Sequence, residues 1–134
     1  MPYADVSTGF NFRARVAYDP ERKQLFHARV RRQLRNLAAA LCLSARDYDL
    51  RSNPGGIAVS GEVTLHADHL YVQVSQPATG SDSGILFRTC RGRKDYEGGR
   101  NNFASLDLLN DPDALARRIM GLVSVEPTSR AAEP

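Results

Sequence analysis

The chain contains few of the residues that mark disulfide scaffolds and membrane anchors. Its 134 residues include two cysteines, Cys42 and Cys90, whereas a disulfide scaffold needs more cysteines at closer spacing. No apolar run approaches the ~18–20 residues that span a bilayer. The N-terminus has neither the basic start nor the apolar core of a secretory signal. We therefore expect a cytoplasmic protein with two free thiols and no membrane partner.

The sequence also lacks the short motifs of several enzyme classes. It has no Gly-x-x-x-x-Gly-Lys-Ser/Thr phosphate-binding loop and no Gly-x-Ser-x-Gly nucleophile elbow. A Cys-x5-Arg phosphatase loop starting at Cys90 would need arginine at position 96, where the chain has Tyr96. A small enzyme with Cys90 or His66 as its reactive group is therefore the weakest hypothesis. No catalytic residue and no cofactor is predicted.

Lysine is scarce, since 16 of the 18 basic residues are arginine. The excess is typical of a GC-rich bacterial genome, and guanidinium groups make planar, bidentate contacts with phosphate and carboxylate. The net charge of +3 is unevenly distributed: residues 20–46 carry +6, residues 47–87 carry −4 and residues 88–100 carry +3. Two basic blocks therefore flank an acidic stretch in the sequence, a pattern that favours an anionic partner.

Composition and length indicate one globular domain. Apolar residues make up 42 % of the chain and charged residues 25 %, which are ordinary values, and the length suits a single domain. We expect this domain to cover residues 1–123 and a mobile tail to cover residues 124–134.

Capping residues and apolar spacing predict two helices. Asp19-Pro20-Glu21 is typical of a helix start, and a stripe at spacings of three and four predicts a helix over residues 20–44. Asp111-Pro112-Asp113 repeats this start, and Gly121 is a suitable end for the second, shorter helix. The apolar stripe of the first helix consists of Phe26, Val30, Leu34, Leu37 and Leu41.

Alternating apolar residues predict five strands. They are expected at residues 10–18, 48–51, 57–65, 70–74 and 85–91. The resulting order is β-α-β-β-β-β-α, and neighbouring short strands imply an antiparallel sheet. We expect an α+β fold in which both helices pack on one face of this sheet.

The two basic blocks supply the candidate binding residues. At ~100° per residue, three arginines of the first helix lie opposite its apolar stripe, and few acidic residues interleave to form ion pairs. The loop from Gly92 to Asn102 combines cations with glycines that let backbone N–H groups approach an anion, and its tyrosine is suited to stacking on a base. The candidate anion- or nucleic-acid-binding residues are Arg31, Arg32, Arg35, Arg91, Arg93, Lys94, Tyr96 and Arg100.

His66, Asp68 and His69 form the remaining cluster of metal-ligating side chains. A two-residue turn at Ala67-Asp68 would make the two histidines cross-strand neighbours, ~5 Å apart at Cβ, and such a set suits zinc. The sequence offers no fourth ligand and no second shell. We therefore interpret the cluster as an exposed polar hairpin tip and predict no metal.

We expect a non-catalytic binding module that recognises nucleic acid or another polyanion through the basic helix and the Gly92–Asn102 loop. The alternative is a protein-interaction module, either an adaptor or an inhibitor. In that case an exposed sheet edge adds a partner's strand, and the charge suits an acidic protein or a self-complementary dimer. The sequence leaves open whether the two basic blocks share one face, and it does not reveal the oligomeric state.

Overall fold

A computed structural model describes residues 9–77, 83–92 and 99–123. The tail predicted at residues 124–134 lies outside these ranges. Within them, two α-helices and two short 3₁₀ helices accompany five strands. In chain order the elements are α1 (Pro20–Ala40), η1 (Ala45–Asp47), β2 (Tyr48–Asn53), β3 (Glu62–Ala67), β4 (Leu70–Ser75), β5 (Ile85–Thr89), β6 (Asn102–Ala104), η2 (Leu106–Asn110) and α2 (Pro112–Val123).

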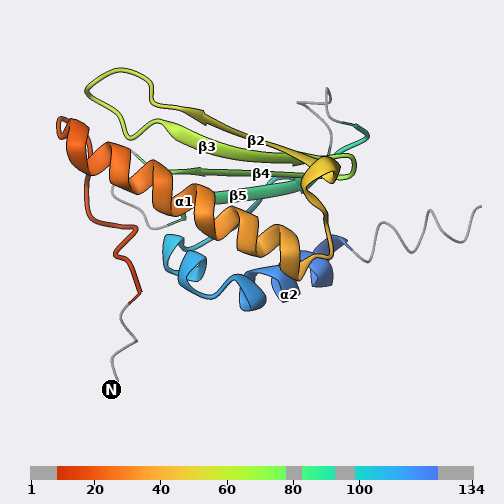
Figure 1. Ribbon diagram of the computed structural model, residues 1–134. Coiled ribbons are helices and arrows are strands. Elements are labelled where there is room, and N and C mark those ends of the chain that lie inside the picture. The colour runs from red at the N-terminus through yellow and green to blue at the C-terminus, as the bar shows by residue number, and fades with distance from the viewer. Residues whose placement is uncertain (1–8, 78–82, 93–98, 124–134) are drawn as a thin grey trace, which may run out of the picture.

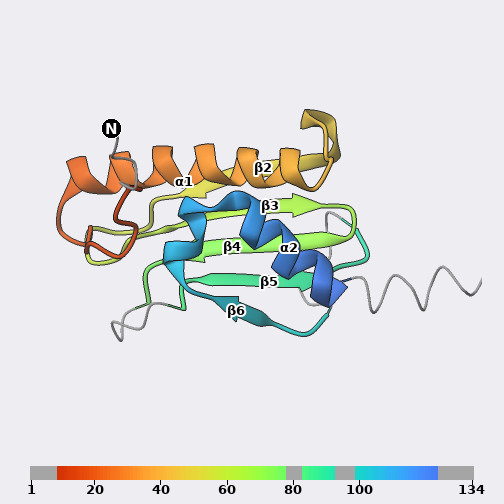
Figure 2. The ribbon, with the colours of Figure 1, turned by 90° about the horizontal axis from the view of Figure 1, so that it is seen from below.

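The strands form one antiparallel sheet in the order β2-β3-β4-β5-β6, so each strand pairs with its neighbours in sequence. Both α-helices lie against the same face of this sheet, as the side view and the view from below show (Figures 1 and 2). The predicted α+β fold with two helices on one face of an antiparallel sheet is confirmed. Strands β2 and β6 form the two edges (Figure 2).

Helix α1 begins as its sequence predicts. The carboxylate of Asp19 accepts a hydrogen bond from the backbone N–H of Arg22 at 3.0 Å, and Pro20 occupies the first helical position. This arrangement satisfies a backbone donor that the helix itself leaves free. Four residues of the apolar stripe, Phe26, Val30, Leu34 and Leu37, are completely buried beneath the sheet.

The same helix ends at Ala40 rather than at residue 44. Cys42 adopts a φ of 63°, in the left-handed region. Its N–H donates to the carbonyl of Ala39 at 3.0 Å, and the N–H of Leu43 donates to the carbonyl of Ala38 at 2.8 Å. These two bonds form a Schellman motif, in which glycine usually occupies the left-handed position. With cysteine there, the sequence carries no stop signal.

The strand expected at residues 10–18 is wrong, because this segment pairs with no other strand. Phe12 and Val16 are buried as their alternation indicated, but Tyr18 is 70 % exposed. A side chain from a distant part of the chain binds the backbone instead. Gln76 accepts from the N–H of Val16 at 3.1 Å and donates to the carbonyls of Phe12 and Ala14 at 3.0 and 2.7 Å.

The first hairpin strand is shorter than predicted, since β3 begins at Glu62 rather than at residue 57. Ile57 and Val59 are 60 % and 50 % exposed. Gly61 precedes the strand with a φ of +73°, and a Cβ at this position would clash with the carbonyl oxygens of Asn53 and Pro54. The glycine therefore marks a close crossing of two backbone segments.

Two features near the C-terminal end also differ from expectation. Strand β6 (Asn102–Ala104) was not predicted, and it pairs with β5 from Ile85↔Ala104 to Phe87↔Asn102. Helix α2 continues through Gly121 to Val123, so this glycine does not end it. The predicted start of α2 is confirmed, because the carboxylate of Asp111 accepts a hydrogen bond from the N–H of Ala114 at 3.1 Å.

Candidate functional site

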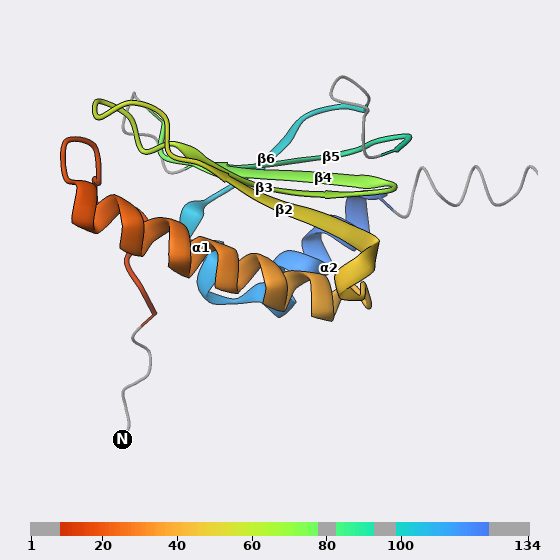
Figure 3. The same ribbon diagram turned by 45° about the horizontal axis from the view of Figure 1, so that its top comes forward.

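Arg31 and Arg35 of the first basic block lie on the flank of α1 that faces the β2 edge of the sheet. The guanidinium of Arg31 donates to the hydroxyl of Ser52 in β2 at 3.1 Å. Arg35 follows one helical turn later on the same flank, while Arg32 is exposed and lies farther from the sheet around the helix. Figure 3 shows β2 running beside α1 along this margin.

The opposite flank of α1 contacts the rest of the domain instead. Gln33 donates to the carbonyl of Leu109 in η2 at 2.6 Å. The guanidinium carbon of Arg29 lies 5.4 Å from the centre of the Phe10 ring, a cation–π contact. The arginines that lie nearest the β2 edge are therefore Arg31 and Arg35, while Arg29 lies on the other flank of the helix.

Arg51 extends this positive margin onto the sheet. It belongs to β2, and its alternation with Ser52 turns its side chain to the face that carries no helix. We define the arginine flank as Arg31, Arg32, Arg35 and Arg51. Sequence reasoning missed Arg51 because nothing in the local pattern showed that β2 would lie against α1.

The arginine flank forms no ion pair within the described part of the chain, although Asp49 and Glu62 line the same hollow as Arg51. In that part of the chain, the ion pairs found join Arg13 to Asp107 at 3.3 Å and Arg22 to Asp19 at 3.5 Å. No described carboxylate comes within 4.0 Å of the four guanidinium groups of the flank. Arginines one helical turn apart repel each other mildly, so a bound anion would relieve this repulsion.

Lys23 and His27 connect α1 to the backbone of the segment between β2 and β3. The ammonium of Lys23 donates to the carbonyls of Pro54 and Gly56 at 3.0 and 2.7 Å, and His27 Nε2 lies 2.8 Å from the carbonyl oxygen of Ser60. Both side chains are more than 90 % buried. They tie the segment that follows β2 to α1.

The second basic block lies elsewhere. His66, whose side chain is on the uncovered face of β3, donates from Nε2 to the carbonyl of Gly92 at 3.0 Å, since a carbonyl oxygen can only accept. This contact puts Arg91 and Gly92 on the face opposite α1. Arg100 precedes β6, at the edge of the sheet opposite β2. Arg93, Lys94 and Tyr96 lie outside the described residues.

Arg88, from the same block, is not a free cation. It is 5 % exposed, and its guanidinium carbon lies 4.6 Å from the centre of the Tyr71 ring. A desolvated cation over an aromatic face is held in place. The described parts of the two basic blocks are therefore separated by the sheet.

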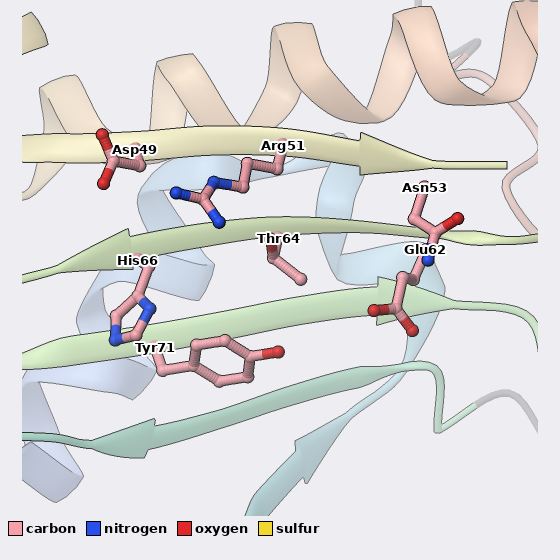
Figure 4. A pocket seen from close by; sticks show the side chains of 7 residues that line it. All are labelled: Asp49, Arg51, Asn53, Glu62, Thr64, His66 and Tyr71. Atoms are coloured by element: carbon pink, nitrogen blue, oxygen red, sulfur yellow. The ribbon is translucent and has the colours of Figure 1, made fainter. Parts of the chain in front are cut away.

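A depression of about 270 Å³ lies on the uncovered face of β2, β3 and β4 (Figure 4). Its charges are mixed, because Arg51 stands between the carboxylates of Asp49 and Glu62. The hydroxyl of Tyr71 donates to the side chain of Gln73 at 2.9 Å. Carboxylates repel phosphate, so this hollow is poorly suited to a polyanion. Its lining residues are Asp49, Arg51, Asn53, Glu62, Thr64, His66 and Tyr71.

The expected turn at Ala67-Asp68 is wrong by one residue, since β3 ends at Ala67 and β4 begins at Leu70. Asp68 and His69 form the turn. His66 consequently lies opposite Tyr71 rather than His69. The described residues contain no group of three or more His, Cys, Asp or Glu side chains placed to hold a metal ion.

The chain matches no protein-family model, no curated protein and no solved structure. Among the helices of the described residues, none has the length and apolar character needed to cross a bilayer.

Proposed function

We propose that this protein is a non-catalytic binding module whose arginine flank binds an anionic macromolecule. The observation that carries the proposal is the run of four guanidinium groups along the β2 margin with no described carboxylate in salt-bridge range. Guanidinium groups suit bidentate contact with phosphate and carboxylate. One of them, Arg31, is held in place by Ser52, which lowers the entropic cost of binding.

The proposed binding surface is smaller than the one that the sequence suggested, which included both basic blocks. The arginine flank follows the β2 edge, with Arg31 and Arg35 on its α1 side and Arg51 on its uncovered side. Arg91 lies away from that edge, because its neighbour Gly92 contacts His66 in β3. The proposed surface therefore excludes the second block. Nucleic acid and an acidic protein both remain members of the anionic class that this surface accepts.

A catalytic role gains no support from the candidate nucleophile. Cys90 is 6 % exposed, and its Sγ lies 3.4 Å from the carbonyl oxygen of Ala67. A buried thiol that donates to a backbone oxygen behaves as a small core residue.

Binding titrations with charge-reversal variants test the proposal. Labelled single-stranded DNA, duplex DNA, RNA and an acidic peptide are titrated at low salt and at ~150 mM salt, because electrostatic binding weakens with salt. The variant Arg31→Glu/Arg35→Glu is compared with Arg100→Glu/Arg117→Glu, which changes the net charge equally at distant exposed sites. We expect only the first to abolish binding at ~150 mM salt. Equal losses in the two variants would show generic attraction and would refute the proposed site.

A further inference from the structure

The two edge strands of the sheet differ in whether a side chain hydrogen-bonds to their outward-facing backbone groups. At the β6 edge, the guanidinium of Arg118 donates to the backbone carbonyl of Phe103 at 2.8 Å, so a side chain already occupies this three-residue strand. Strand β2 has six residues and pairs with β3 alone among the described strands. Its last three residues, Arg51 to Asn53, are exposed. An exposed edge of this length is a template for another strand.

A second copy of the chain fits this edge poorly. Antiparallel self-pairing centred on Leu50 would align Asp49 with the Arg51 of the other copy, which is favourable. However, α1 lies beside β2 in each copy (Figure 3). The same pairing would bring the Arg31 and Arg35 side chains of both copies together. Four guanidinium groups without carboxylates repel, and charged residues beside an edge oppose self-association.

The same charges favour an acidic strand. In a strand added to β2, alternate side chains turn toward α1 and toward the uncovered face. Residues on one side of a strand repeat every ~6.8 Å, and Arg31 and Arg35 are ~6 Å apart along the helix. Acidic residues at positions i and i+2 would therefore meet these two arginines. The residue between them would turn toward the uncovered face, where Arg51 stands between Asp49 and Glu62.

We propose that the β2 edge receives an extended acidic segment of another protein as a sixth strand of the sheet. This inference rests on the proposed function and specifies its partner. The partner is a peptide segment with three consecutive acidic residues, of which two face α1 and one faces the uncovered face of the sheet. The backbone of the segment pairs with β2, and its side chains pair with the arginine flank. Strand addition of this kind draws affinity from main-chain hydrogen bonds and specificity from the alternate side chains.

Nucleic acid satisfies the charges of the flank but has no peptide backbone to pair with β2. The test therefore compares probes of similar charge that differ in backbone. The first is the blocked peptide Val-Thr-Glu-Glu-Glu-Thr-Val. The second replaces both threonines by proline, which keeps the charge but removes backbone donors and disfavours strand pairing. The third is a short single-stranded DNA.

Binding is measured by calorimetry, and amide hydrogen exchange is followed in β2. We expect the threonine peptide to bind about tenfold more tightly than the proline peptide, the equivalent of one or two lost hydrogen bonds. It should also slow exchange at Tyr48–Asn53, and Arg31→Glu/Arg35→Glu should remove its binding. Strand addition is overturned if both peptides and the DNA bind equally and leave amide exchange in β2 unchanged. The proposed function still stands in that case, provided that the binding of all three probes requires Arg31 and Arg35. If no probe binds, both are overturned.

Discussion

Replacing Gln76 by alanine is expected to destabilise the folded protein by about 2–3 kcal/mol. This side chain makes three hydrogen bonds to the segment before α1, one with the N–H of Val16 at 3.1 Å and two with the carbonyls of Phe12 and Ala14 at 3.0 and 2.7 Å. Each contributes ~0.5–1.5 kcal/mol net. Three such bonds sum to about 1.5–4.5 kcal/mol. The expected loss lies in the lower part of this range, because Gln76 is only half-buried and water replaces part of the loss.

Urea unfolding followed by circular dichroism measures this loss, with ΔG extrapolated to water at constant m-value. Gln24→Ala is the matched control, because Gln24 is exposed on α1 and its replacement should change stability by less than about 0.5 kcal/mol. Trypsin cleavage after Arg13 and Arg15 should also accelerate in Gln76→Ala, since the segment that contains them is released. A change indistinguishable from that of Gln24→Ala would refute the assignment of Gln76 as the residue that holds this segment.

Three further predictions concern buried and strained residues. Lys23→Met should lower the free energy of unfolding by about 1–3 kcal/mol, because it leaves the carbonyls of Pro54 and Gly56 without a donor. Thermal unfolding measures this loss, and an unchanged Tm would contradict the prediction. Cys42→Gly should stabilise the protein by about 0.5–1 kcal/mol, because the φ of 63° at this position strains a residue with a side chain but not glycine. A loss of stability in urea unfolding would contradict this prediction and would show that the cysteine side chain contributes to packing. A thiol reagent should modify exposed Cys42 much faster than buried Cys90, and equal rates would contradict that burial.

Local patterns predicted the elements whose stabilising contacts are close in sequence. The start of α1 depends on Asp19 and Pro20, and its buried face depends on the spacing of its own apolar residues. Strands β4 and β5 alternate as expected, with Val72 and Phe87 completely buried. These features are set by a helix turn or a strand period, so a short window of sequence contains the necessary information.

The features that the sequence missed depend on distant residues. Residues 10–18 alternate like a strand, but a glutamine 60 or more positions away binds their backbone, and no window around them contains it. The early end of α1 was missed because Cys42 takes the position where glycine is the usual signal. β6 is three residues long, too short for alternation to be distinguished from chance.

The candidate site was predictable only in part. The 3.6-residue period placed Arg31, Arg32 and Arg35 away from the core. It gave no information about which flank meets the β2 edge, because that depends on how the helix packs on the sheet. Arg51 entered the site through that packing. The second block was expected to act with the first, but the sheet lies between Arg91 and α1.

The most direct measurement of anion binding at the arginine flank is an arginine Nε–Hε NMR titration. The acidic peptide Val-Thr-Glu-Glu-Glu-Thr-Val is added to ¹⁵N-labelled protein at ~150 mM salt, and resonances are assigned with single Arg→Lys variants. We expect the Nε–Hε signals of Arg31, Arg35 and Arg51 to shift and saturate together, while those of Arg100 and Arg117 stay unchanged. Shifts that are largest at Arg100 or Arg117, or uniform over all arginines, would contradict the proposed binding surface.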